Sequence, residues 1–190
     1  MKKNIAIFAS GGGSNAEEIM RHFKGNSVAR VSLIVSNNPK SGALYRAEKY
    51  NIPGYVHQPE ELLNGKLENV LAAYKIDFIV LAGYLKKVPD GIIKKFNKKL
   101  VNIHPALLPK YGGHGMYGMN VHKAVVTAGE KFTGITIHYV NENYDEGAII
   151  EQHVCEISPK DLANDVQEKV LKLEHEFFAP CIEKLISQLD

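Results

Sequence analysis

The 190-residue chain contains 45% hydrophobic and 23% charged residues and carries a formal net charge of +2. This composition is typical of a globular protein with a substantial core. A charge so close to neutral argues against a nucleic-acid-binding or membrane-surface protein, and no apolar stretch is long enough to span a bilayer. The two cysteines, Cys155 and Cys181, have no metal-site or redox spacing. They are typical of reduced thiols in a cytoplasmic protein.

Strand-like and helix-like patterns alternate through the first half of the chain. The expected strands cover residues 5–9, 28–35, 53–56 and 77–82, and the expected helices cover 14–23, 43–50 and 59–74. Continuous apolar runs such as 5–9 are typical of strands buried on both faces of a parallel sheet. The alternation predicts an α/β fold with a doubly wound, mostly parallel sheet. Such sheets bind ligands beyond the carboxyl ends of their strands.

The second half of the chain predicts a C-terminal hairpin and a long final helix. The expected elements are a helix at 88–96, a strand from 100, a mobile loop at 110–120, a helix at 121–128, strands at 132–140 and 148–157, and a helix at 159–189. Pro180 is expected to interrupt the last helix, because proline removes a backbone hydrogen bond. With no linker or repeat, residues 1–190 are expected to form a single domain.

A glycine loop at residues 10–15 follows the first expected strand. Ser14 and Glu17 fit a capping box, so a helix should begin at Ser14. Successive backbone N–H groups at a helix start can bind an anion. No lysine follows the glycines, which argues against a nucleotide-binding P-loop, and residues 36–38 lack the acid that a dinucleotide site requires. The loop is therefore interpreted as a site for one phosphate, assisted by Ser14 and Asn15; a structural tight turn is the alternative.

Asn102 and His104 are two residues apart on an expected strand, so their side chains leave the same face. Pro105 keeps His104 in an extended conformation. A neighbouring amide donor and imidazole can stabilise an oxyanion and transfer a proton. A strand end with a polar cap is the alternative interpretation.

Asp145 lies in an expected turn at 141–147, after the strand that carries His138. If Asp145 approaches His104, it should raise the pKa of that imidazole and keep it cationic. An Asx-turn residue is the alternative. Residues 84–88 follow a buried strand, and their backbone is suited to hydrogen bonding a flat heterocycle; an ordinary connection is the alternative.

Together these motifs resemble the phosphoribosylglycinamide (GAR) formyltransferases, which belong to a superfamily that uses formyltetrahydrofolate. The resemblance covers nearly the whole chain in order. It is carried by Gly13-Ser14-Asn15, Leu81-Ala82-Gly83-Tyr84, Asn102-Ile-His104-Pro-Ala-Leu-Leu-Pro109, Thr136-Ile-His138-Tyr-Val140 and Asp145-x-Gly147. It implies a Rossmann-like formyltransferase fold. The further domains of the tRNA-directed and hydrolase relatives are expected to be absent.

The resemblance implies transfer of a formyl group from 10-formyltetrahydrofolate, the co-substrate, to the amine of GAR in purine biosynthesis. Asn102 would donate to the oxyanion, His104 would act as the acid, and Asp145 would raise the histidine pKa and order a water. The N-terminal half would bind the ribonucleotide, and the C-terminal half would bind folate and carry catalysis. The implied contacts to GAR are Gly13, Ser14, Asn15 and Glu174, and those to folate are Leu85, Lys86, Lys87, Val88 and Asn102.

Small-molecule substrates are thus the expected partners, with no metal, nucleic acid or membrane, and a weak homodimer is left open. Two departures from the family concern the folate tail and one loop. Lys86 stands where bacterial relatives often have arginine, and Lys66 is the nearest substitute for a second basic residue. The loop at 111–120 is longer than expected, either as a lid or as a plain surface loop.

Three competing functions follow from the same residues. A formyltetrahydrofolate hydrolase would use water in place of the amine, but it would not need a phosphate loop. A non-catalytic nucleotide-binding module would bind ligand without turnover, and it would leave Asn102, His104 and Asp145 without a shared purpose. A dinucleotide-dependent oxidoreductase would require NAD(P) binding.

Overall fold

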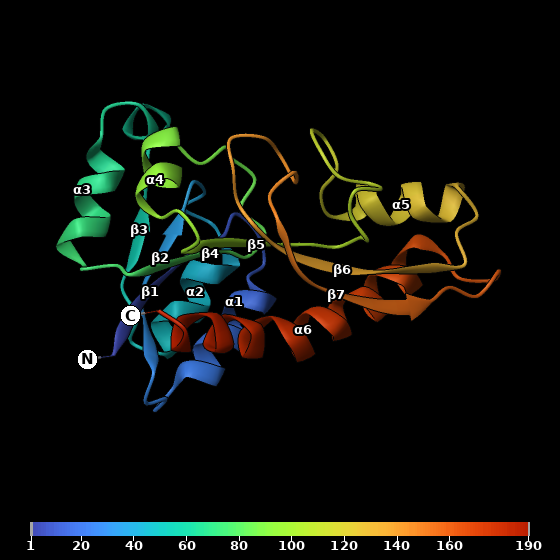
Figure 1. The fold of residues 1–190 in the computed structure, drawn as a ribbon, viewed down its shortest axis with the longest axis horizontal. Helices are drawn as coiled ribbons and strands as arrows, with labels where there is room; N and C mark the ends of the chain where they lie inside the picture. The colour runs from blue at the N-terminus through green and yellow to red at the C-terminus, as the bar shows by residue number, and fades with distance from the viewer. Residues whose placement is uncertain (1, 190) are drawn as a thin grey trace.

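A seven-stranded sheet organises the computed structural model, which describes residues 2–189 (Figure 1). The strand order is β3-β2-β1-β4-β5-β6-β7. The strands are β1 (Lys3–Phe8), β2 (Ala29–Ser36), β3 (Gly54–Val56), β4 (Phe78–Leu81), β5 (Leu100–His104), β6 (Phe132–Tyr139) and β7 (Ile149–Glu156). The first five pair in parallel, whereas β6 pairs antiparallel with β5 and β7. The predicted mostly parallel sheet with a C-terminal hairpin is confirmed.

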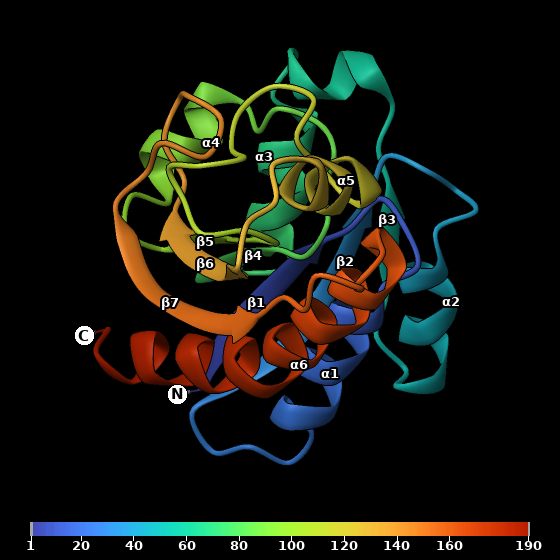
Figure 2. The ribbon, with the colours of Figure 1, turned by 90° about the vertical axis from the view of Figure 1, so that its right-hand side faces the viewer.

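Helices cover both faces of the sheet. They are α1 (Ser14–Phe23), α2 (Gly42–Lys49), the 3₁₀ helix η1 (Pro59–Leu62), α3 (Lys66–Ala73), α4 (Asp90–Lys95), α5 (Met119–Thr127) and α6 (Ala163–Ser187). Figures 1 and 2 show α1 and α6 on one side of the sheet and α3 and α4 on the other. Among residues 2–189, no helix combines the length and apolarity needed to cross a membrane.

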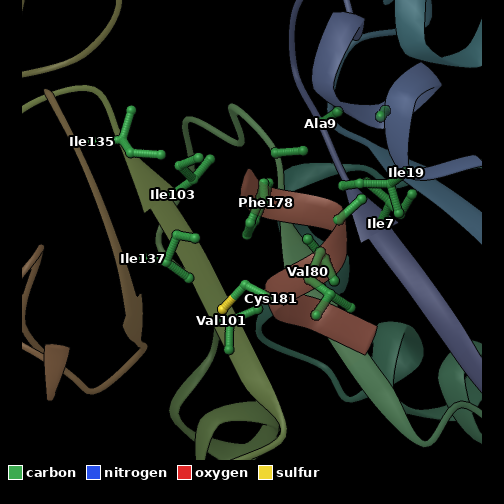
Figure 3. Close-up of a cluster of buried hydrophobic side chains, with 14 of the residues drawn as sticks. Ile7, Ala9, Ile19, Val80, Val101, Ile103, Ile135, Ile137, Phe178 and Cys181 are labelled. Carbon is green, nitrogen blue, oxygen red and sulfur yellow. The ribbon is translucent and has the colours of Figure 1, made fainter. Parts of the chain in front are cut away.

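The central strand β1 faces two separate cores. Ile5 and Ile7 belong to a cluster with α1 and α6, whereas Ala6 and Phe8 belong to a cluster with α3 and α4. This period-2 alternation explains why the run is apolar throughout. Figure 3 shows Phe178 of α6 in the first cluster, together with side chains of β1, β4 and β5. The long C-terminal helix therefore packs beneath the strands whose ends carry the candidate residues.

The predicted capping box at the start of α1 is wrong. The N-cap is Gly13, which has a left-handed backbone (φ 76°), and Ser14 is the first helical residue. A Cβ at position 13 would lie 2.5 Å from the Cα of Ala43, so a side chain there would collide with α2. Glu17 pairs with Arg46 of α2 instead of reaching back to the cap. The close approach of two helix starts thus replaces local side-chain capping.

Two other helix predictions need correction. The expected helix at 59–74 divides into η1 and α3, because Gly65 adopts a left-handed conformation (φ 78°) between them. The interruption predicted at Pro180 does not occur, and α6 runs unbroken over 25 residues. Phe178 and Ile182, on either side of the proline, are almost fully buried. Their packing offsets the one backbone hydrogen bond that proline removes.

Gly134 of β6 provides a test of how tightly the hairpin packs. A Cβ there would lie 1.9 Å from the carbonyl oxygen of His153 on β7. We expect Gly134→Ala to lower the free energy of unfolding by ~2 kcal/mol or more in urea titrations, because backbone must move. Gly91→Ala in α4 is the matched control, since its Cβ would meet only the flexible Glu68 carboxylate at 3.2 Å. A similar loss for both variants would contradict this explanation.

Candidate active site

A cavity of about 770 Å³ opens at the carboxyl ends of β1, β4 and β5. It is the position expected for a ligand in a doubly wound sheet. Its walls come from the glycine loop, residues 83–88, residues 102–105, residues 113–118, residues 140–145 and one face of α6. The segments that the sequence identified separately therefore share one cavity.

Asn102, His138 and Asp145 form a polar group on one wall of the cavity. Asn102 and His138 are directly opposite each other in the β5–β6 pairing. The Asn102 Nδ2 atom lies 3.1 Å from His138 Nε2 and 3.5 Å from Asp145 Oδ1. The Nδ1 atom of His138 is 2.8 Å from the carbonyl oxygen of Tyr139. The His138 Nε2 atom also lies 3.6 Å from Asp145 Oδ1, so the three side chains contact one another.

His104 lies on the same wall, and its side chain is almost completely buried. Its Nδ1 atom is 3.5 Å from Asp145 Oδ2, within ion-pair distance. Its Nε2 atom is 2.7 Å from the carbonyl oxygen of Tyr111, to which it donates. The backbone N–H of Gly113 donates to the same Asp145 oxygen at 2.9 Å. The 110–120 loop thus contacts both members of the His104–Asp145 pair.

The pKa of His104 differs from the sequence-based expectation. Burial lowers the pKa below the ordinary 6.5, and this effect outweighs the raising effects of Asp145 and the Tyr111 carbonyl. The predicted net rise is therefore wrong, although Asp145 acts in the predicted direction. A pattern of residues identifies a neighbouring charge, but it does not reveal how completely the imidazole is removed from water.

The pKa of Asp145 moves in the opposite sense. Burial alone would raise it, but His138, His104 and the Gly113 N–H together hold the pKa below its ordinary 3.8. Asp145 is therefore a carboxylate near neutral pH, despite being largely shielded from water. An ionised acid beside a neutral histidine can accept or redirect a proton without large movements.

The glycine loop lies at the other end of the cavity. Ser14 and Asn15 line it, and Asn15 Nδ2 donates to Glu174 Oε2 on α6 at 2.7 Å. Asn15 Oδ1 is buried without a hydrogen-bond partner. Burial raises the pKa of Glu174, and the bond from Asn15 offsets only part of that rise. Gly13 itself is not among the lining residues, so its contact with a substrate stays a prediction.

The four predicted folate-contacting residues after β4, Leu85, Lys86, Lys87 and Val88, all line the cavity. The Leu85 N–H already donates to Ser10 Oγ at 2.9 Å. Lys66 pairs with Glu61 and lies outside the cavity lining. Among residues 2–189, no group of three or more His, Cys, Asp and Glu side chains is placed to hold a metal ion.

Sequence reasoning assigned no side-chain contact to His138 or to Tyr84. His138 was placed on a strand and within the family resemblance, yet it contacts Asn102 and Asp145. The antiparallel register of 102 with 138 would have revealed it. Tyr84 lines the cavity, and its hydroxyl is 2.8 Å from Nε2 of the buried His57. No local pattern connects these two residues.

The lowered pKa of His104 predicts a pH-dependent stability. The unfolded chain binds the His104 proton more tightly than the folded protein does. Protonation of the unfolded chain therefore lowers the free energy of unfolding as the pH falls below 6.5, and above that pH this loss is absent. Urea unfolding between about pH 7.5 and about pH 5.5 should show a flatter pH dependence for His104→Gln than for the wild type, by at most about 1.4 kcal/mol per pH unit. Parallel curves would contradict the assignment.

Comparisons with known proteins identify the family of the chain. A sequence profile of the formyl transferase family matches residues 3–182. The phosphoribosylglycinamide formyltransferase of Bacillus subtilis is 34% identical over 190 residues, which cover 97% of this chain and 95% of that protein. The chloroplastic enzyme of Vigna unguiculata is 38% identical across 98% of this chain. The chain spans only 62% of that plant protein.

Solved structures agree as well. The crystal structure of phosphoribosylglycinamide formyltransferase from Bacillus halodurans has a TM-score of 0.89 and 32% identity, covering 99% of this chain and 97% of that one. A formyltetrahydrofolate deformylase from Pseudomonas syringae shares the fold, with a TM-score of 0.86 and 21% identity over 98% of this chain and 62% of that one. The chain belongs to the formyl transferase family, within its phosphoribosylglycinamide formyltransferases.

Proposed function

We propose that this chain transfers the formyl group of 10-formyltetrahydrofolate to the amine of GAR, giving formyl-GAR and tetrahydrofolate in purine biosynthesis. The observation that supports the proposal is one cavity with two chemically different ends. Asn102, His104 and Asp145 converge at one end, and the backbone of the glycine loop lies at the other. Formyl transfer between two bound molecules requires this combination of positioning and oxyanion stabilisation.

In the proposed reaction, the GAR amine attacks the formyl carbon and a tetrahedral oxyanion forms. Asn102 donates a hydrogen bond to it. The Asn102 hydrogen directed toward Asp145 is the one to be redirected, because that contact is 3.5 Å long whereas the His138 contact is 3.1 Å. The carbon–N10 bond of the folate then breaks, the amine loses a proton, and N10 gains one.

His104 is proposed to mediate these proton transfers. It is neutral near neutral pH in the free protein because burial lowers its pKa. A developing oxyanion nearby favours the cationic imidazole, so His104 can take up the proton that the amine loses and then donate a proton toward N10. Asp145 stabilises that cation across 3.5 Å and is proposed to order a water that carries the proton between the two nitrogens.

Gly13, Ser14 and Asn15 are proposed to bind the GAR phosphate. Their backbone N–H groups lie at the start of a ten-residue helix, where the dipole favours an anion. Glu174, buried behind Asn15, is proposed to contact the ribonucleotide. Asn15 Oδ1, which is buried and unpaired, offers an acceptor to a ligand N–H or O–H.

The formyl donor is proposed to bind against residues 85–88. Since Leu85 N–H is already used, the ring would be held by the remaining backbone groups of Lys86, Lys87 and Val88. Lys86 is exposed at the cavity and is proposed to meet the glutamate tail of the folate. Lys66 is held by Glu61 and is a weaker candidate for that contact.

We also propose that residues 1–190 act as one domain, with the ribonucleotide in the N-terminal half and folate and catalysis in the C-terminal half. A cytoplasmic location completes the proposal, and a weak homodimer is compatible with it. The reaction as proposed uses small-molecule partners and needs no metal, nucleic acid or membrane.

A GAR-dependence assay separates transfer from hydrolysis. Release of tetrahydrofolate from 10-formyltetrahydrofolate should require GAR and should match formyl-GAR production one for one. The phosphate-binding loop is the physical reason, because a hydrolase has no ribonucleotide to hold. Equal release without GAR would favour the deformylase activity, and binding of either ligand without any turnover would favour a non-catalytic module.

Asn102→Ala and Asp145→Ala are each expected to reduce turnover at least ~100-fold, since each removes a group that acts on charge in the transition state. Steady-state kinetics measures the loss, and circular dichroism should show an intact fold. Asp161→Ala is the matched control, because Asp161 pairs with Lys169 and does not line the cavity. Near-normal turnover in both Asn102→Ala and Asp145→Ala would contradict the mechanism.

A further inference from the structure

Ser10, the first residue of the glycine loop, is hydrogen-bonded through each of its polar groups. Its side chain is buried, at 6% exposure for the residue. Its N–H donates to the carbonyl oxygen of Gly83 at 3.0 Å, and its carbonyl oxygen accepts from Asn38 Nδ2 at 3.4 Å. Its hydroxyl donates to Asn37 Oδ1 at 2.6 Å and accepts from Leu85 N–H at 2.9 Å. Ser10 therefore joins segments that follow β1, β2 and β4.

These contacts lie beyond the regular sheet. The register of β1 with β4 runs from Ile5–Phe78 to Phe8–Leu81. Ser10 and Leu85 come after its end, so ordinary strand pairing does not explain their bond. The neighbouring Tyr84 is anchored separately, by its hydroxyl at His57 and by edge-to-face contact with Phe8. The 83–88 segment is thus held by specific side-chain bonds.

Ser10 connects two segments that line the cavity. Gly11, the next residue in the chain, lines the cavity as part of the glycine loop, and Leu85 lines it as part of the 83–88 segment. The Ser10 N–H bond to Gly83 and the Ser10 hydroxyl bond to Leu85 therefore both connect the glycine loop with the 83–88 segment, and the hydroxyl is the side-chain part of that connection. The free-energy cost of ordering a shared element falls on the first ligand, and the second ligand then binds more tightly.

We propose that Ser10 is a positioning residue that couples occupancy of the glycine loop to binding of the formyl donor. The inference rests on the proposed function, which supplies the identities of the two ligands. Ser10 does not touch the reacting atoms. It acts by holding the Leu85 amide, and so the 83–88 segment, in the arrangement that the donor meets.

The test measures tetrahydrofolate binding to the full chain by calorimetry, with and without saturating GAR. No formyl group is present, so no turnover occurs. In the wild type, GAR should tighten tetrahydrofolate binding by at least about fivefold, the lower range of measured couplings. In Ser10→Ala the ratio should fall toward one. Amide exchange at Leu85 should slow on adding GAR in the wild type but not in the variant.

Steady-state kinetics provides a second reading. Ser10→Ala should raise the KM for 10-formyltetrahydrofolate by about fivefold or more, because the coupling contributes to donor binding, while kcat changes less than about twofold. Ser10→Thr keeps the hydroxyl and should restore much of the ratio. Ser10→Cys replaces the hydroxyl with a somewhat larger thiol that hydrogen-bonds weakly, so it serves where the alanine variant folds poorly.

Ser41→Ala is the matched control. Ser41 is equally buried and donates its hydroxyl to the Gly11 carbonyl at 2.9 Å, but it does not contact the 83–88 segment. It should retain the coupling ratio even if stability falls. An unchanged ratio in Ser10→Ala and Ser10→Cys, or a wild type without coupling, would overturn the inference. Failure of the proposed function would appear differently, as no binding of GAR or no GAR-dependent transfer in the wild type.

Discussion

The candidate site depends on a single shielded carboxylate. Asp145 receives contacts from three parts of the chain: Asn102 on β5, His138 on β6 and Gly113 in the 110–120 loop. An ionised acid at this depth is stable only because these groups replace the water that it has lost. The antiparallel pairing of β5 with β6 is therefore more than a sheet contact. It holds Asn102 and His138 opposite each other at the position where the acid arrives.

The glycine-loop side of the cavity is built on close backbone packing instead of side-chain chemistry. Gly13 lets the start of α1 approach α2, and Gly42 does the same from the other side, where a Cβ would lie 2.5 Å from the Gly12 carbonyl oxygen. The two helix starts are thereby brought together at one end of the sheet. The two parts of the cavity therefore differ in what shapes them. Removal of charged groups from water dominates around Asp145 and the histidines, whereas close backbone packing dominates at the glycine loop.

Much of the fold was predictable from the sequence, because apolar runs and helical periods report burial directly. The Asn102–His104 pair was also predictable, since strand periodicity fixes which side chains share a face. The net pKa of His104 was not, because it depends on how much water the folded chain excludes. The cap at Gly13 was not either, because its cause is Ala43, thirty positions away in the sequence. Local sequence patterns describe single elements, whereas the His104 pKa and the Gly13 cap both depend on contacts between elements.

The 110–120 loop supplies one contact to each partner of the acid–base pair, and these contacts have opposite consequences. The Gly113 amide makes the Asp145 carboxylate a poorer base, whereas the Tyr111 carbonyl makes the His104 imidazole a better one. When the loop makes these contacts, the difference in basicity between His104 and Asp145 is therefore larger than when the contacts are broken. The backbone of this glycine-rich segment thus helps to decide which of the two side chains takes up a proton.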